Sequence, residues 1–167
     1  MLLIKQGDAI EDNFRALADD EALPEAATVM VSLARWQAER DMLIQRNAPL
    51  GLRLKSSESP LILGDDVHRF AAIAIEFPTF KDGRGFSYAR RLREQMGYDG
   101  ELRAVGHLIP DQAQFLARVG FDTVEVKDDA NLASWARGFS DFSVFYQTAA
   151  DRLTPVFHLR QMKQAAE

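Results

Sequence analysis

The side chains best suited to chemistry gather in one short segment that follows an apolar, Ile-containing run at 71–77. This segment contains, in order, Lys81, Asp82, Gly83, Arg84, Gly85 and Ser87. Its glycines allow positive φ and a close approach of the backbone to a ligand. The first N–H groups of a helix beginning near Ser87 would attract an anion, and the cationic side chains would add charge-assisted hydrogen bonds. The segment is therefore predicted to bind a small oxyanion.

The same residues also fit a purely structural turn. In that interpretation Asp82 accepts backbone N–H bonds, and Arg84 pairs with Glu76 or Glu101. The segment lacks the Gly-Lys-Ser/Thr ending of a P-loop and the glycine spacing of a dinucleotide-binding fold. Ligand binding and a structural turn both remain open from the sequence.

Other candidate residues stand where predicted strands end. Lys55, Glu76, His107 and Asp111 are expected at the carboxyl edge of a parallel sheet, where ligands bind in such folds. His107 could act as a general base that Asp111 orients, or it could be an ordinary hydrogen-bonded residue at a strand end. Glu76, Asp82 and Asp111 could together hold Mg²⁺, although carboxylates are common at loop mouths. The histidines lack zinc-ligand spacing, and no metal or cofactor is assigned.

Composition limits the classes of function. The chain has 167 residues, 47% hydrophobic and 27% charged, which predicts one globular domain. A net charge of −5 argues against a general nucleic-acid binder. The absence of cysteine excludes disulfides, thiol nucleophiles and Cys-ligated clusters within the chain, and is typical of a reducing compartment. No signal peptide or apolar run of about 18 residues is found, so we expect a cytoplasmic protein that does not enter membranes.

The elements that must position these residues alternate along the chain. Strands are predicted at 28–33, 50–55, 71–77, 102–108 and 123–126, with helices at 35–45, 64–70, 87–96, 111–119 and from Asn131 through Trp135. Gly120 can end the fourth of these helices with a left-handed cap, and Asn131 can cap the start of the last one. This rhythm predicts an α/β fold with a mainly parallel sheet of about five strands and crossover helices. Within one domain, 1–167, residues 1–27 form an N-terminal hairpin arm along one sheet edge. Residues 28–138 form the βα core, and 139–167 form an aromatic C-terminal segment.

Charged residues on several strands suggest how the sheet is wound. Arg53, Glu76, Arg103 and Glu125 each alternate with apolar neighbours. Either the sheet is single-wound, like part of a barrel, with one polar face, or these charges reach solvent at strand ends. A polar face would need cover from the arm, from the tail or from a second subunit in a homodimer.

The C-terminal segment is aromatic. Its aromatic residues Phe139, Phe142, Phe145 and Tyr146 recur at three- and four-residue spacings, which predicts one helix face. That face is expected to pack on the sheet, or alternatively to bind another chain.

Several blocks of the sequence resemble one bacterial family. They are the run 76–87, then Leu92-Arg93, Gly97-Tyr98, 100–106, Arg118, 120–122, 141–144 and Tyr146-Gln147. This set is similar to domain-of-unknown-function family nine-three-four, which is often labelled an oxidoreductase and is encoded beside assimilatory sulfite reductase. The resemblance implies a role in sulfite reduction and cysteine biosynthesis, with a sulfite reductase subunit as a partner. It supplies no catalytic residue and no cofactor, and the chain carries no recognisable redox motif.

Three hypotheses follow. The first is an accessory protein of assimilatory sulfite reduction that binds a small oxyanion or a reductase subunit through the 81–87 loop. The second is a barrel-like enzyme that uses Lys55, Glu76, Asp82 and Asp111 on a phosphate-bearing or carboxylate substrate. The third is a structural protein whose aromatic tail docks onto another chain.

Overall fold

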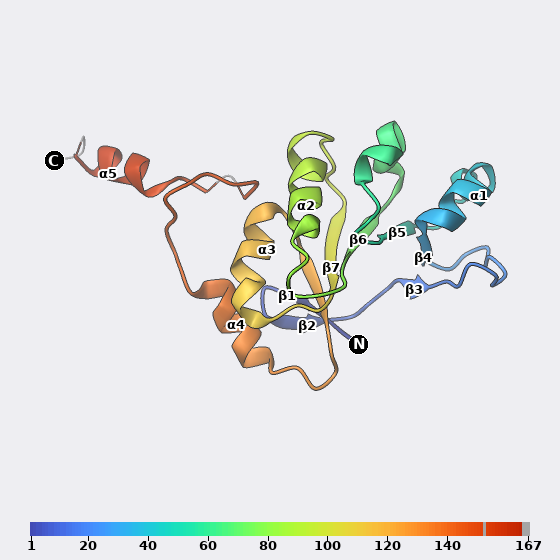
Figure 1. The fold of residues 1–167 in the computed structure, drawn as a ribbon, viewed down its shortest axis with the longest axis horizontal. Coiled ribbons are helices and arrows are strands. Elements are labelled where there is room, and N and C mark those ends of the chain that lie inside the picture. Colours follow the sequence, from blue (N-terminus) through green and yellow to red (C-terminus); the bar gives the residue numbers. More distant parts are fainter. Residues whose placement is uncertain (152, 165–167) are drawn as a thin grey trace.

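A computed structural model, which describes residues 1–151 and 153–164, shows an α/β protein built on one curled sheet (Figure 1). The eight strands lie in the order β2-β1-β8-β7-β6-β5-β4-β3. Their bounds are β1 (Leu2–Lys5), β2 (Asp8–Ile10), β3 (Arg15–Ala16), β4 (Val29–Ser32), β5 (Leu50–Leu54), β6 (Ala72–Phe77), β7 (Glu101–Gly106) and β8 (Thr123–Val126). Strands β3 to β8 are parallel, whereas β1 runs antiparallel to both β8 and β2.

The winding of the sheet follows from this strand order. From β4 to β8 each strand pairs with the next one in the chain. Right-handed crossovers that always step in the same direction place the helices on one face, as in part of a barrel. The mainly parallel α/β prediction is therefore confirmed. The count of about five strands was too low, because the hairpin β1–β2 extends one edge of the sheet and the two-residue β3 extends the other.

The helices cover the convex face. They are α1 (Leu33–Ile44), α2 (Arg84–Glu94), α3 (Ala113–Val119), α4 (Leu132–Ser140) and the 3₁₀ segments η1 (Pro60–Arg69) and η2 (Pro110–Gln112). The last helix, α5 (Val156–Gln164), has no buried residue and takes no part in this cover. The helix expected at 64–70 is thus longer and begins at Pro60, where the Ser59 side chain caps it. Ile73, Ile75 and Phe77 of β6 pack into the core beneath these helices.

The opposite, concave face is covered by the N-terminal arm. The arm was predicted to lie along one edge, but β2 and β3 occupy opposite edges, so residues 11–14 cross the face between them. Phe14 packs there against a small apolar cluster of Met30, Ala72, Ala74 and Val105. We call residues 11–17 the strap.

Of the four charged strand residues, Arg53, Glu76 and Arg103 face this concave side and are paired, whereas Glu125 makes no ion pair with the described residues. Arg53 donates to Glu76 at 2.7 Å, and Arg103 donates to Asp12 of the strap at 2.7 Å. The polar face expected of a single-wound sheet is thus present, and the strap supplies cover without a second subunit.

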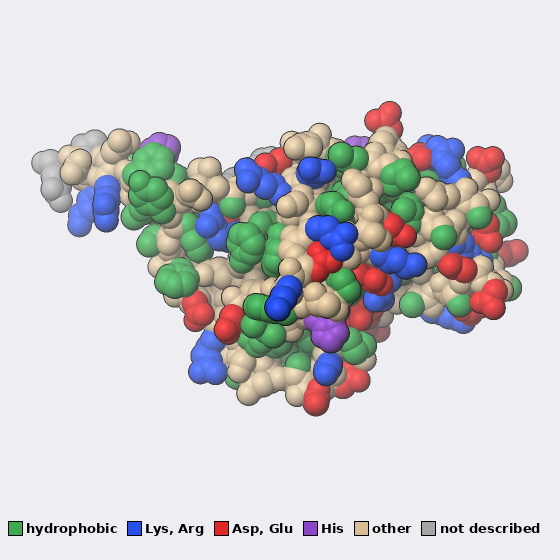
Figure 2. Space-filling view, viewed as in Figure 1, with side chains coloured by type: hydrophobic (Ala, Val, Ile, Leu, Met, Phe, Trp, Pro, Cys, Tyr) green, Lys and Arg blue, Asp and Glu red, His purple; other side chains and the backbone are tan. Residues whose placement is uncertain are grey.

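The C-terminal segment differs from its prediction. Helix α4 ends at Ser140, so Phe142, Phe145 and Tyr146 do not share a helix face. The Ser140 hydroxyl donates to the carbonyl oxygens of Ala136 and Arg137, a bond pattern that competes with continuation of the helix. Residues 142–151 are still bound to Gln114 and Arg118 of α3. The chain then leaves the body and forms α5 (Figure 1), and hydrophobic side chains are visible at the surface of this projection (Figure 2).

None of the helices formed by the described residues has the length and apolar character needed to cross a membrane.

Candidate functional site

A pocket of about 560 Å³ opens at the carboxyl ends of β6, β7 and β8. We call it the strand-end pocket. This edge is where parallel α/β folds bind their ligands, and the volume lies within the usual range for small-molecule sites, about 300–1,000 Å³. Three loops and one helix line the pocket. The lining residues are Pro78, Thr79, Phe80, Gly106, His107, Leu108, Ile109, Glu125, Val126, Lys127, Asp129, Ala130 and Trp135.

Glycine 106 shapes the wall that carries His107. Its φ is +110°, and a Cβ at this position would collide with the carbonyl oxygen of Phe77. That same oxygen accepts the N–H of His107 at 2.8 Å, which ties the end of β7 to the end of β6. The backbone is therefore fixed where the imidazole joins the pocket.

Helix α4 closes the floor of the pocket with Trp135, whose side chain is only 3% exposed. Asn131 caps the helix by accepting the N–H of Ser134 at 3.1 Å, as predicted. Two glycines let other segments approach the helix closely: a Cβ on Gly138 would collide with the carbonyl oxygen of Pro110, and one on Gly7 would collide with Ala136. The position of α4 thus depends on both the hairpin and η2.

The pocket combines apolar walls with charged groups at its rim. Phe80 and Ile109 are 59% and 39% exposed, so apolar surface faces the opening. His107, Glu125, Lys127 and Asp129 add titratable groups. Within residues 1–151 and 153–164, none of these four side chains makes a hydrogen bond or an ion pair with another residue. Polar groups without internal partners beside an apolar pocket are available to a ligand.

The 81–87 segment, in contrast, satisfies much of its polarity internally. Its helix begins at Arg84, not near Ser87 as predicted, so only residues 81–83 of this segment are loop. We keep the name 81–87 loop for the whole segment. The Asp82 carboxylate accepts from the Arg84 guanidinium at 2.6 and 2.9 Å and from the Arg84 backbone N–H at 3.2 Å. Arg84 also donates to the Ser56 hydroxyl at 3.1 Å. The backbone bond to Asp82 agrees with the structural-turn interpretation. The expected partner of Arg84 was wrong, because Asp82 lies two residues away whereas Glu76 is already paired with Arg53.

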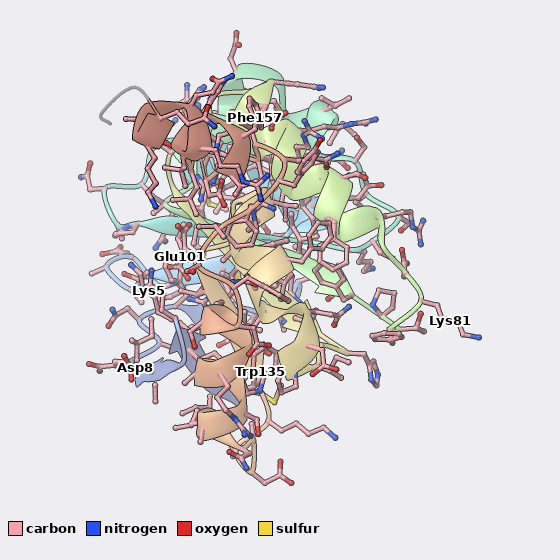
Figure 3. The ribbon with its side chains drawn as sticks, turned by 90° about the vertical axis from the view of Figure 1, so that its left-hand side faces the viewer. Lys5, Asp8, Lys81, Glu101, Trp135 and Phe157 are labelled. Carbon is pink, nitrogen blue, oxygen red and sulfur yellow. The ribbon has the colours of Figure 1, made fainter. Side chains whose placement is uncertain are left out.

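The other predicted residues do not converge on one point. Lys81 points away from the protein into solvent (Figure 3). Ser87 lines a separate groove between α2, α3 and residues 147–150. The backbone N–H of Lys55 donates to the Glu58 carboxylate in the loop that follows β5. No hydrogen bond between His107 and Asp111 occurs in the part of the chain that the structure describes.

The three carboxylates considered as ligands of Mg²⁺ also lie in different parts of the fold. Glu76 lies on the concave face, Asp82 in the β6–α2 loop and Asp111 in η2. Across the described residues, no group of three or more His, Asp or Glu side chains is arranged to hold a metal ion.

Sequence reasoning missed part of the pocket. Phe80, Lys127 and Trp135 were not singled out as site residues, although Lys127 directly follows β8. Its position at the carboxyl end of this last strand is the sequence signal that indicates Lys127. No local signal identifies Trp135, because its role depends on where α4 docks.

The Asp82–Arg84 pair makes the loop sensitive to acid. The Arg84 guanidinium holds the pKa of the Asp82 carboxyl well below its ordinary value near 3.8. The carboxylate therefore stabilises the folded state above about pH 3.8, and this contribution is lost as the pH falls toward the lowered pKa. We expect Asp82→Asn to lower the urea midpoint at pH 7, with the difference from wild type shrinking below pH 3.8. A difference that is the same at pH 7 and pH 3 would contradict this account.

Comparison with known proteins shows which family the chain resembles. The model of a family described as "Bacterial protein of unknown function (DUF934)" matches residues 51–157. The chain belongs to this family. No curated protein and no solved structure matches the chain significantly.

The DUF934 match covers the chain from β5 to the start of α5. Every residue that lines the strand-end pocket lies within it, as does the 81–87 loop. The hairpin, the strap and α1 lie outside the matched residues. The candidate site is therefore built entirely from the DUF934 part of the chain.

Proposed function

We propose that this protein binds a small organic anion in the strand-end pocket and serves as an accessory protein of assimilatory sulfite reduction and cysteine biosynthesis in the cytoplasm. The observation that carries the proposal is that the His107 and Lys127 side chains, at the rim of a largely apolar pocket, have no hydrogen-bond or ion-pair partner among the described residues. The metabolic setting comes from the sequence resemblance of residues 76–87 and the blocks that follow them.

The chemistry of the walls limits the class of ligand. Lys127 supplies three N–H donors and His107 one or two, which suits a carboxylate, sulfonate or phosphate group. Phe80, Ile109 and Trp135 would contact an apolar body attached to that group, which bare sulfate or sulfite lacks. Glu125 and Asp129 would disfavour ligands with several negative charges.

The 81–87 loop is the weaker anion site on geometric grounds. A free anion would have to compete with the Asp82 carboxylate for the Arg84 guanidinium. The carboxylate is held by the chain two residues away, so it pays little entropy to stay bound.

A thermal-shift screen tests the proposal. Small carboxylates, sulfonates and phosphates with apolar bodies are compared with sulfite, sulfate and inorganic phosphate. A ligand at 100 times its Kd adds about 2.7 kcal/mol to the stability of the folded state, which corresponds to roughly 5–10 °C for a chain of this size. We expect such a shift for organic anions and a smaller one for the inorganic ions.

Variants locate the site. Lys127→Ala and His107→Ala should each weaken binding about tenfold or more in calorimetric titration, since each removes a donor to the anion. Lys81→Ala is the matched control, because it removes a lysine that points into solvent (Figure 3), and it should leave the affinity unchanged. If Arg84→Ala abolishes binding while Lys127→Ala does not, the 81–87 loop is the site. If no anion shifts the melting temperature, the proposal fails.

A further inference from the structure

The C-terminal arm, residues 153–164, presents apolar side chains that the other described residues do not cover. No residue of α5 is buried. Phe157, Leu159 and Met162 are 43%, 39% and 67% exposed. A helix of nine residues is marginal in water by itself, so α5 needs a surface to pack on.

The root of the arm is nevertheless held firmly. Arg118 of α3 donates to Asp151 at 3.0 Å and to the carbonyl oxygen of Gln147, and its guanidinium lies 3.9 Å from the centre of the Phe145 ring. The N–H of Val156 donates to the carbonyl oxygen of Phe145 at 2.7 Å. These contacts fix the start of α5 and direct the helix away from its own body (Figure 1).

The charges of the arm and the body are opposite. Residues 1–151 carry 24 Asp and Glu against 17 Lys and Arg, a net charge of −7. Residues 153–164 carry Arg160 and Lys163 and no acidic residue. A basic, apolar helix therefore projects from an acidic body, and Figure 2 shows blue and green side chains together on the arm.

We propose that the C-terminal arm docks on the acidic body of a second copy of this chain, forming a homodimer in which the two arms are exchanged. The charge complementarity between arm and body selects this occupant. Direct pairing of the two α5 helices would bring Arg160 and Lys163 of one copy close to those of the other, and like charges repel. Exchange around a twofold axis buries both arms at once and closes the assembly.

The oligomeric state of the full chain tests the proposal. We expect a dimer in sedimentation velocity, whose affinity falls as salt screens the attraction between arm and body. Replacing Phe157, Leu159 and Met162 together with serine should weaken the dimer about 100-fold. Arg160→Glu with Lys163→Glu should weaken it about tenfold. The control Gln161→Ala with Gln164→Ala changes polar positions of the same helix and should leave the dimer intact.

The absence of cysteine allows the contact to be mapped. Met162→Cys can carry a single benzophenone in a mixture of ¹⁴N and ¹⁵N chains. Cross-links from a labelled arm to a 1–151 peptide of the other isotope would support exchange. A monomer at all concentrations, a dimer that the triple variant retains, or cross-links confined to one chain or to the two arms would overturn the proposal. None of these variants alters the strand-end pocket, so this result is independent of ligand binding.

Discussion

Replacing Gly106 with alanine should destabilise the protein by about 2–6 kcal/mol. The backbone there has φ +110°, a region that costs side-chain-bearing residues roughly 1–3 kcal/mol. In addition, the new Cβ would collide with the carbonyl oxygen of Phe77, and relieving such a clash typically costs about 1–3 kcal/mol. Urea denaturation measures the loss, and ligand affinity should fall with it because His107 is displaced from the pocket wall.

Gly97→Ala is the matched control for this prediction. Gly97 also has a positive φ, +62°, but a Cβ there would meet nothing within 4 Å. Its replacement should cost only about 1 kcal/mol, which is the backbone penalty without the clash. Equal losses at Gly97 and Gly106 would show that the contact between the ends of β6 and β7 contributes nothing.

The features that could be predicted from the sequence are those that depend on residues close together in the chain. The strand at 71–77 was predicted from a short apolar, Ile-containing run that is followed by Pro78, and the structure places β6 at Ala72–Phe77. Gly120 was predicted to end a helix, and it caps α3 in the left-handed conformation with φ +109°. These features depend on residues within one or two turns of each other.

Features that join distant segments could not be predicted in the same way. Asp12 and Arg103 are 91 positions apart, and no local pattern indicates that the strap carries one to the other. The same limit applies to the hairpin, which was predicted, while its pairing with β8 was not.

Part of the candidate site could be predicted from the sequence, and part could not. The strand-end rule placed His107 at the correct edge of the sheet. It could not show that α4 would bring Trp135 beneath the pocket, since this depends on close packing at Gly7 and Gly138. The rule also could not show which carboxylate pairs with Arg84, because the partner depends on the path of the backbone in the loop.

Removing the charge of Arg103 is the second substitution expected to have a large effect. This side chain is 2% exposed and donates to Asp12 at 2.7 Å and to Glu101 at 3.1 Å, with the Phe14 ring 5.6 Å from its guanidinium carbon. Burial alone would lower the pKa of Arg103, but the Asp12 hydrogen bond and the Glu101 charge raise it overall. Breaking a buried pair by removing one partner costs about 3–5 kcal/mol, so Arg103→Met should cost about 3 kcal/mol because Asp12 is partly exposed.

The region that becomes less stable in Arg103→Met shows whether the Arg103–Asp12 pair holds the strap on the concave face. Hydrogen exchange should show faster opening of residues 11–17 in Arg103→Met, because Asp12 loses its cation and Phe14 loses the cation–π contact with the guanidinium. Asp12→Asn should cost less and, combined with Arg103→Met, should be far from additive. Arg53→Met is the control, since its pair with Glu76 is partly exposed and should contribute about 0–1 kcal/mol. If Arg103→Met and Arg53→Met cost the same, the strap is held by Phe14 packing alone, and the buried charges do not fix it across the concave face.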